Sequence, residues 1–203
     1  PDFLLTVCFP RLLPPEMLAI PRLGGLNLHP SLLPAYRGPE PLFWQFYFGE
    51  QHTGITLHWM DDHADTGDIV FQAEVPFPDG ISHTQAETFT ALAGGELLRR
   101  AWADPEHLPR IPQPQQGASS HSRPTAKNLI LPDTWPARRA FNFIRAARDW
   151  GPFEIVVQGS GQPLRVREAT GFEERGGTAT PHKTGGEEVW VAFADGVVKV
   201  RLT

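Results

Sequence analysis

Two polar residues suited to acyl chemistry, Asn27 and His29, lie two positions apart in a short apolar segment. Side chains two apart on a strand point to the same face, and Pro30 ends this segment directly after them. An asparagine amide can stabilise a developing oxyanion, and an imidazole can move protons near neutral pH. Asp65, which follows the next predicted strand, can orient and charge-stabilise such an imidazole. These three side chains form a candidate catalytic trio.

The hydrophobic pattern predicts the elements that position the trio. Residues 3–9 are almost wholly apolar, which is typical of a strand buried on both faces of a parallel sheet. Residues 26–29 and 53–60 predict two further strands, and a capping box predicts a helix over 84–102. Ligands of open α/β sheets bind at the carboxyl ends of strands. By residue type alone each member of the trio is more often structural, so the placement is what favours a site.

Composition and charge divide the chain into two parts. The 203 residues are 40% hydrophobic and 20% charged, with 19 glycines and 21 prolines, which excludes an all-helical bundle. Residues 1–103 predict an α/β domain, residues 104–129 a proline-rich linker, and residues 130–203 a helix with a small β-rich domain. The net charge of −5 is distributed unevenly, and the first part is much more acidic than the second. The two parts are therefore expected to have different tasks.

The sequence carries few signals of a special environment. No apolar run approaches the roughly 18 residues of a membrane span, and no secretory signal pattern is present, so we expect a cytoplasmic protein that does not contact membranes. The single cysteine, Cys8, cannot form an internal disulfide.

The acidic loop 61–68 does not match the EF-hand calcium-binding pattern, because Thr66 stands where that pattern requires glycine. A solvated acidic loop is the favoured interpretation.

The segment from Asn27 to Ile69 resembles the signature of folate-dependent formyltransferases. The resemblance rests on NLHPSLLPAYRG at 27–38, GITLH at 54–58 and DTGDI at 65–69, in matching order and spacing. The ending YRGPEP at 36–41 is similar to the branch that formylates methionyl-tRNA or sugar amines, more than to the glycinamide-ribonucleotide branch. A helix followed by a small β domain also resembles that branch.

This resemblance implies a fold and a reaction. The α/β fold would be a partial Rossmann-like formyltransferase domain with a parallel-dominated sheet, followed by a small OB-like β-barrel. An amine would attack the formyl carbon of 10-formyltetrahydrofolate while Asn27 stabilises the oxyanion. His29, held by Asp65, would move a proton from the amine to the leaving nitrogen, and no metal is needed. The residues implied to contact the folate donor are Ser31, Leu32, Leu33, Pro34, Arg11, Leu12 and His63.

The chain also departs from the family, whose α/β domain begins with several elements before the strand that residues 3–9 resemble. We therefore expect a fragment of a longer protein. The acceptor stays open among methionyl-tRNA, a sugar amine and an amino acid. A hydrolase acting on the same donor and a non-catalytic folate-binding module are the alternatives. If the acceptor is tRNA, four arginines of a predicted helix over about 135–149 would meet phosphates, although a solvated helix face is simpler: Arg138, Arg139, Arg145 and Arg148.

Overall fold

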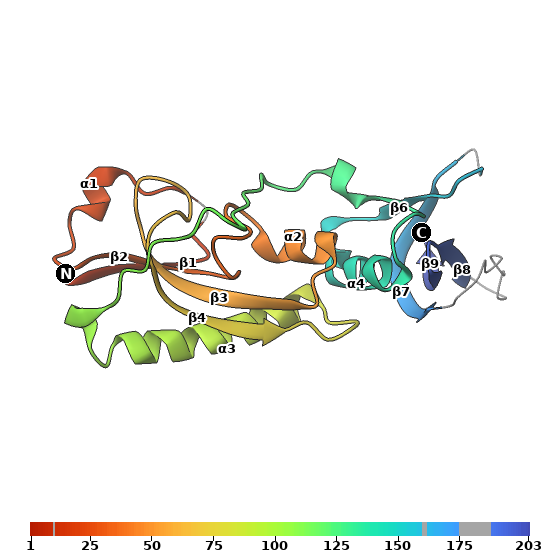
Figure 1. Ribbon diagram of the computed structural model, residues 1–203. Coiled ribbons are helices and arrows are strands. Elements are labelled where there is room, and N and C mark those ends of the chain that lie inside the picture. The colour runs from red at the N-terminus through yellow and green to blue at the C-terminus, as the bar shows by residue number, and fades with distance from the viewer. Residues whose placement is uncertain (10, 160–161, 175–187) are drawn as a thin grey trace. The chain divides into compact units, whose positions relative to one another are not determined.

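The computed structural model describes residues 1–9, 11–159, 162–174 and 188–203, and the chain divides into two compact units (Figure 1). The first unit comprises Pro1–Trp44, His52–Phe77 and Thr84–Arg123. The second comprises Gln45–Gln51, Pro78–His83 and Pro124–Thr203. No helix among the described residues is long and apolar enough to cross a bilayer.

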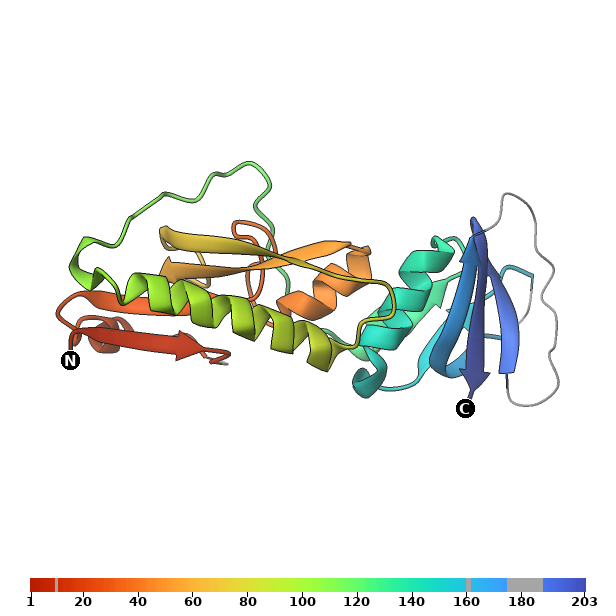
Figure 2. The same cartoon turned by 90° about the horizontal axis from the view of Figure 1, so that it is seen from below.

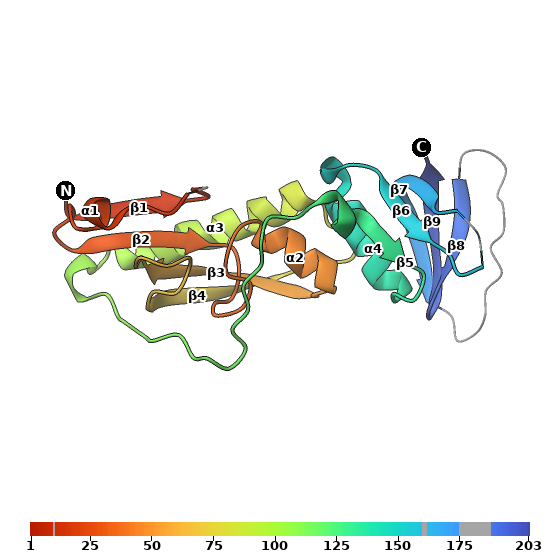
Figure 3. The same ribbon diagram turned by 90° about the horizontal axis from the view of Figure 1, so that it is seen from above.

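The first unit is built on a four-stranded sheet whose order is β1-β2-β3-β4 (Figure 3). Its strands are β1 (Phe3–Val7), β2 (Gly24–His29), β3 (His52–Trp59) and β4 (Ile69–Pro76). β1 and β2 run parallel, whereas β2–β3 and β3–β4 are antiparallel. The prediction of a parallel-dominated sheet is therefore wrong for this unit. The loop 60–68 is shorter than the dozen or so residues that a parallel crossover needs, so β4 turns back along β3.

β1 is more exposed than its apolar sequence predicted. Leu5 and Val7 are 36% and 53% exposed, and Phe9 beyond the strand is 51% exposed. Among the described strands β1 has a neighbour on one side only, which is β2. The run of apolar residues correctly predicted a strand, but the expectation of burial on both faces is wrong. The short helix α1 (Pro15–Leu18) lies in the connection to β2.

The long helix α3 (His83–Ala101) packs on one face of this sheet (Figure 2) and agrees with the predicted helix over 84–102. Gly94 lets the helix approach closely, because a Cβ there would lie 3.3 Å from side-chain atoms of Leu28 and Ile55. Strand side chains alternate between faces. Leu26 and Leu28 therefore fill the core while Asn27 and His29 lie on the other face of β2. The core comprises Leu26, Leu28, Ile55, Leu57, Trp59, Val70, Leu97 and Ala101.

The proline-rich segment after α3 belongs to the first unit as far as Arg123. The sequence instead predicted a linker between the two parts over residues 104–129. The segment begins with the short helix η1 (Pro105–His107). Ile111 exchanges two backbone hydrogen bonds with Ile69 of β4, at 2.8 and 3.0 Å. The indole of Trp59 donates to the carbonyl of Pro109 over 2.9 Å. The composition correctly predicted irregular backbone in this segment. The long-range hydrogen bonds to β3 and β4 hold that backbone in place.

The second unit contains a five-stranded sheet of order β5-β6-β7-β9-β8 and the helix α4 (Ala137–Ala146), which lies against β7 and β9. β5 and β8 form the two edges, so the described strands do not close into a barrel and the OB-like barrel is not confirmed. The helix α2 (Pro41–Phe48) spans the division between the units. The other elements are β5 (Ile130–Pro132), β6 (Phe153–Val156), β7 (Leu164–Glu174), β8 (Glu188–Phe193), β9 (Gly196–Leu202), η2 (Ala126–Leu129) and η3 (Arg148–Trp150).

Candidate active site

The structure brings the three side chains of the predicted trio together in the first unit, with Asp65 at the centre. The Nδ2 group of Asn27 donates to Oδ1 of Asp65 over 3.4 Å, and Nδ1 of His29 lies 3.6 Å from Oδ2. The backbone N–H of Gly38 also donates to Oδ2, at 2.8 Å. One carboxylate thus faces an amide donor, an imidazole and a backbone donor. The convergence agrees with the spacing in the sequence, whereas the catalytic roles stay predictions.

A row of side chains across three strands fixes the orientation of the Asn27 amide. Thr6 of β1 and His58 of β3 are both in register with Asn27 of β2. The hydroxyl of Thr6 donates to Oδ1 of Asn27 over 2.8 Å, and Nε2 of His58 lies 3.1 Å from Nδ2. Because Oδ1 of Asn27 accepts the hydrogen bond from Thr6, the two hydrogens on Nδ2 point toward His58 and Asp65.

His58 also belongs to this site, although it was not among the predicted site residues. Its ring is 2% exposed, and Nδ1 lies 2.7 Å from the carbonyl oxygen of Trp59. A carbonyl only accepts, so Nδ1 carries a hydrogen, while Nε2 faces Nδ2 of Asn27 at 3.1 Å and Oδ1 of Asp65 at 3.6 Å. The alternation of residues 53–60 was visible in the sequence. The register that sets His58 beside Asn27 was not, because it depends on how β2 pairs with β3.

His29 is a buried histidine whose two nitrogens have different partners. Its Nε2 lies 2.8 Å from the carbonyl of Tyr36, so Nε2 donates there and Nδ1 faces Asp65. Burial lowers the pKa of His29, while the charge of Asp65 and the bond to Tyr36 act in the opposite direction. Burial has the larger effect. The ring is therefore neutral at pH 7 and Nδ1 is able to take up a proton.

Asp65 keeps its charge in spite of partial burial. Burial acts to raise the pKa of this carboxyl, but the imidazoles of His58 and His29 together with the Gly38 N–H outweigh it, and the pKa lies below its usual range. Asp65 also has a positive φ of 56°, and Gly67 lies so close to the carbonyl of Trp59 that no side chain would fit there. The carboxylate is thus held by a tightly built loop.

The loop 31–34, predicted to contact the donor, is held close to the trio by Thr56 of β3. The Thr56 hydroxyl donates to the carbonyl of Ser31 over 2.6 Å and accepts from the backbone N–H of Leu33 over 3.1 Å. Gln72 of β4 donates to the same hydroxyl and to the carbonyl of Leu33, both at 2.9 Å. Ser31 and Leu33 are buried, and Leu32 and Pro34 are half-buried. The backbone of this loop is therefore fixed before any ligand arrives.

Replacing Thr56 with valine is expected to lower the free energy of unfolding by about 1–3 kcal/mol. The change keeps the side-chain shape but leaves the buried N–H of Leu33 and carbonyl of Ser31 without their partner. Urea denaturation monitored by circular dichroism measures the effect. Thr88→Val on the exposed face of α3 is the matched control and should shift stability by no more than about 0.5 kcal/mol. Equal stabilities for the two variants would contradict the structural role given to Thr56.

The other three residues predicted to contact the donor lie at the surface. Arg11 and Leu12 are exposed between β1 and α1, and His63 is exposed in the loop after β3. Within the described ranges, no hydrogen bond or ion pair joins any of them to the trio. The structure thus brings the loop 31–34 and the trio together by way of Thr56, and leaves these three as predictions.

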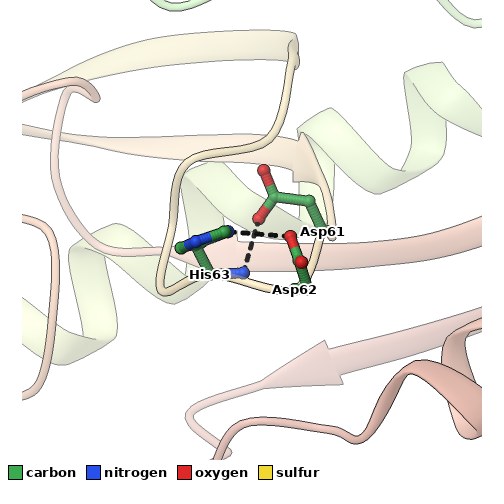
Figure 4. Close-up of side chains that lie close together, drawn as sticks. All are labelled: Asp61, Asp62 and His63. Carbon is green, nitrogen blue, oxygen red and sulfur yellow. Dashed lines mark hydrogen bonds and ion pairs between the residues drawn. The ribbon is translucent and has the colours of Figure 1, made fainter.

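The loop that leads to Asp65 begins with a small exposed cluster (Figure 4). Ligand-type atoms of Asp61, Asp62 and His63 lie within 4.8 Å of one another, the one group of this kind found among the described residues. His63 Nδ1 contacts Asp62 at 2.7 Å, and the hydroxyl of Thr66 donates to Asp61 at 2.8 Å. These contacts shape the turn before Asp65, and exposed acidic groups of this type are common without an ion.

Comparison with known proteins shows which family this chain is similar to. The sequence profile of the formyl transferase family matches residues 1–101. The chain is 35% identical over 185 residues to a methionyl-tRNA formyltransferase of Pelotomaculum thermopropionicum and 33% identical over 208 residues to that of Acetivibrio thermocellus. These alignments cover 89% and 99% of the chain. They cover 58% and 66% of the relatives, so the chain spans about three-fifths of their length.

Solved structures give the same answer for the fold. An N-formyltransferase of Helicobacter canadensis, in complex with folinic acid and dTDP-3-aminofucose, superposes with a TM-score of 0.73 at 19% identity, covering 96% of this chain and 71% of that one. A formyltransferase of Anoxybacillus kamchatkensis, in complex with a formamido sugar nucleotide and tetrahydrofolate, gives 0.54 at 27% identity, covering 60% and 64%. By sequence match and by fold, the chain belongs to the folate-dependent formyltransferase family.

Proposed function

We propose that the protein transfers a formyl group from 10-formyltetrahydrofolate to a primary amine. The observation that carries this proposal is the convergence of an amide donor, a neutral imidazole and a charged carboxylate beside the preformed loop 31–34. A carbonyl group that becomes negatively charged during attack by an amine needs a hydrogen-bond donor, and the amine needs a base. The Asn27, His29 and Asp65 side chains supply these functions without covalent bonding to the protein.

Asn27 would bind the formyl oxygen through Nδ2. One Nδ2 hydrogen is shared with His58 at 3.1 Å, whereas the contact with Asp65 is longer, at 3.4 Å. The hydrogen that faces Asp65 is therefore the one more easily given to a substrate oxygen. Because Thr6 and His58 already fix the amide plane, this donor needs no reorientation when negative charge develops.

His29 would accept the amine proton at Nδ1. Its Nε2 hydrogen stays on the carbonyl of Tyr36, so the ring keeps one orientation during the transfer. Asp65 Oδ2, 3.6 Å from Nδ1, would stabilise the imidazolium until the ring gives the proton to the leaving nitrogen. The donor would lie along the loop 31–34, with Arg11, Leu12 and His63 as outer contacts. The folinic acid and tetrahydrofolate bound by the two structural relatives support a donor of this class.

Methionyl-tRNA is the acceptor we propose, because relatives that carry this name are 33–35% identical along most of the chain. A sugar amine is the second candidate. It is favoured by the aminofucose and formamido-sugar complexes of the structural relatives. Both acceptors offer a primary amine, so the trio by itself does not distinguish between them.

The four arginines considered as tRNA contacts have partners inside the second unit. Arg139 donates to the carbonyl of Tyr47 over 2.8 Å and lies 3.7 Å above the ring of Trp135. Arg138 contacts Glu174 at 3.1 Å, Arg148 contacts Glu168 at 3.2 Å, and Arg145 lies 3.3 Å from the carbonyl of Gly80. A structural role for this group is therefore better supported than a role in phosphate binding.

An assay with three acceptors tests the proposal. Protein produced from its complete gene is mixed with 10-formyltetrahydrofolate and with methionyl-tRNA, a dTDP-linked amino sugar, or no amine. Formyl transfer to methionyl-tRNA is expected. Transfer only to the sugar would change the acceptor, formate release without an amine would indicate a hydrolase, and donor binding without turnover would indicate a non-catalytic module. His29→Ala should abolish turnover, and His107→Ala, at an exposed histidine paired with Asp104, is the matched control.

A further inference from the structure

The side chain of Gln113 uses its full hydrogen-bonding capacity between two loops of the candidate site. Its Nε2 group donates to the carbonyls of Asp65 and Gly67, at 2.9 and 2.8 Å. Its Oε1 atom accepts from Nε and Nη2 of Arg37, at 3.1 and 2.6 Å. A side-chain amide has two hydrogens and two lone pairs, and all four are engaged here. Gln113 comes from the proline-rich segment, 48 positions after Asp65 in the sequence.

The two loops that Gln113 joins hold the partners of the trio. Arg37 lies between Tyr36, whose carbonyl accepts the Nε2 hydrogen of His29, and Gly38, whose N–H donates to Oδ2 of Asp65. The backbone of Arg37 is bonded to the same segment a second time, through Ser119 and His121. The distance between the His29 ring and the Asp65 carboxylate therefore depends on how these two loops are held together.

Both loops adopt backbone conformations that need support from outside. Tyr36 has a φ of 61° and Asp65 a φ of 56°, a region in which residues other than glycine are strained. Such conformations persist where surrounding contacts over-determine them. The bonds from Gln113 fall on the residue that follows Tyr36, on Asp65 itself and on Gly67. These hydrogen bonds would therefore oppose a change of Tyr36 or Asp65 to a less strained backbone conformation.

We propose that Gln113 is a positioning residue that locks the Tyr36–Gly38 loop to the Asp65–Gly67 loop and so sets the geometry of His29 and Asp65. This inference rests on the proposed formyl transfer for its effect on rate. Gln113 touches no reacting atom and acts through the backbone carrying Asp65. The segment that supplies it is thus part of the catalytic unit and does more than connect it to the second unit.

The test compares Gln113→Met with Gln116→Met, which makes the same change at an exposed position of the same segment. Loss of positioning by an ångström can cost about 10²-fold in rate, so we expect kcat of Gln113→Met to fall about 10- to 100-fold. The dissociation constant of the folate donor should stay within about threefold, because the loop 31–34 is held by Thr56 and not by Gln113. Gln116→Met should match the unchanged protein. Gln113→Glu serves as a second variant, since it keeps both bonds from Arg37 while losing both donors, and it should also be impaired.

A double-mutant cycle separates positioning from a general loss of stability. If Gln113 acts through Asp65, then Gln113→Met should change the rate of an Asp65→Asn variant by less than about threefold. A general structural effect would reduce the rate by the same factor in both backgrounds and would overturn the proposal. Wild-type kcat in Gln113→Met would overturn it as well.

A measurement without turnover distinguishes failure of this inference from failure of the proposed function. Amide hydrogen exchange at Gly38, followed by NMR, reports its bond to Asp65. We expect exchange to be at least about tenfold faster in Gln113→Met than in Gln116→Met, since local opening controls exchange. Faster exchange in a protein that shows no formyl transfer would refute the proposed function while the link between the loops stands. Unchanged exchange would refute the link itself.

Discussion

The Asn27→Ala variant is expected to lose about 10²–10³-fold in kcat for formyl transfer, the usual cost of removing one donor to a developing oxyanion. The structure gives a specific reason for a large effect. Thr6 and His58 contact the amide at its oxygen and its nitrogen, so its Nδ2 hydrogens are held in place before negative charge develops. Steady-state kinetics with saturating donor measures the loss, and the change in KM should be small by comparison.

Two further variants make this result interpretable. Asn27→Asp keeps the size and the bond from Thr6 but removes the donor, so it should be as impaired as the alanine variant. Asn128→Ala changes an asparagine that caps η2 in the second unit and should leave turnover unchanged. Full activity in either Asn27 variant would exclude an oxyanion role for this residue.

Replacing His29 with alanine is expected to lower kcat by about 10²–10⁴-fold, the range of general acid–base catalysis. In the unchanged protein the neutral ring is the active form. Activity should therefore be present above the pKa of His29 and fall as the pH drops through it. Because burial lowers this pKa, the acid limb of the kcat profile should lie below about pH 6.5, the value for an unperturbed histidine.

The Asp65→Asn variant checks the sign of this pH dependence. The charge of Asp65 acts to raise the pKa of His29, so removing the charge should lower that pKa further and move the acid limb to lower pH. The maximal rate should also fall, since the imidazolium loses its counter-charge. An acid limb that moves to higher pH, or one that persists unchanged in His29→Ala, would show that another group controls the profile.

The sequence by itself determined the features that depend on short-range patterns. Alternation and proline placement located β2 and β3, a capping box located α3, and the two-residue spacing put Asn27 and His29 on one face. The acidic loop after β3 brought Asp65 into the prediction. These features follow from local rules, because side-chain direction repeats every two residues in a strand and helix signals span only a few positions.

Only the tertiary structure decided which distant groups meet. The antiparallel pairing of β2 with β3 set His58 beside Asn27, and among the described strands β1 pairs only with β2. The segment with Gln113 looked like a linker in the sequence, yet its amide bonds the loops around Asp65 and Arg37. Strand register and long-range hydrogen bonds arise from how whole elements pair, and an irregular segment has no periodicity from which its partners could be predicted.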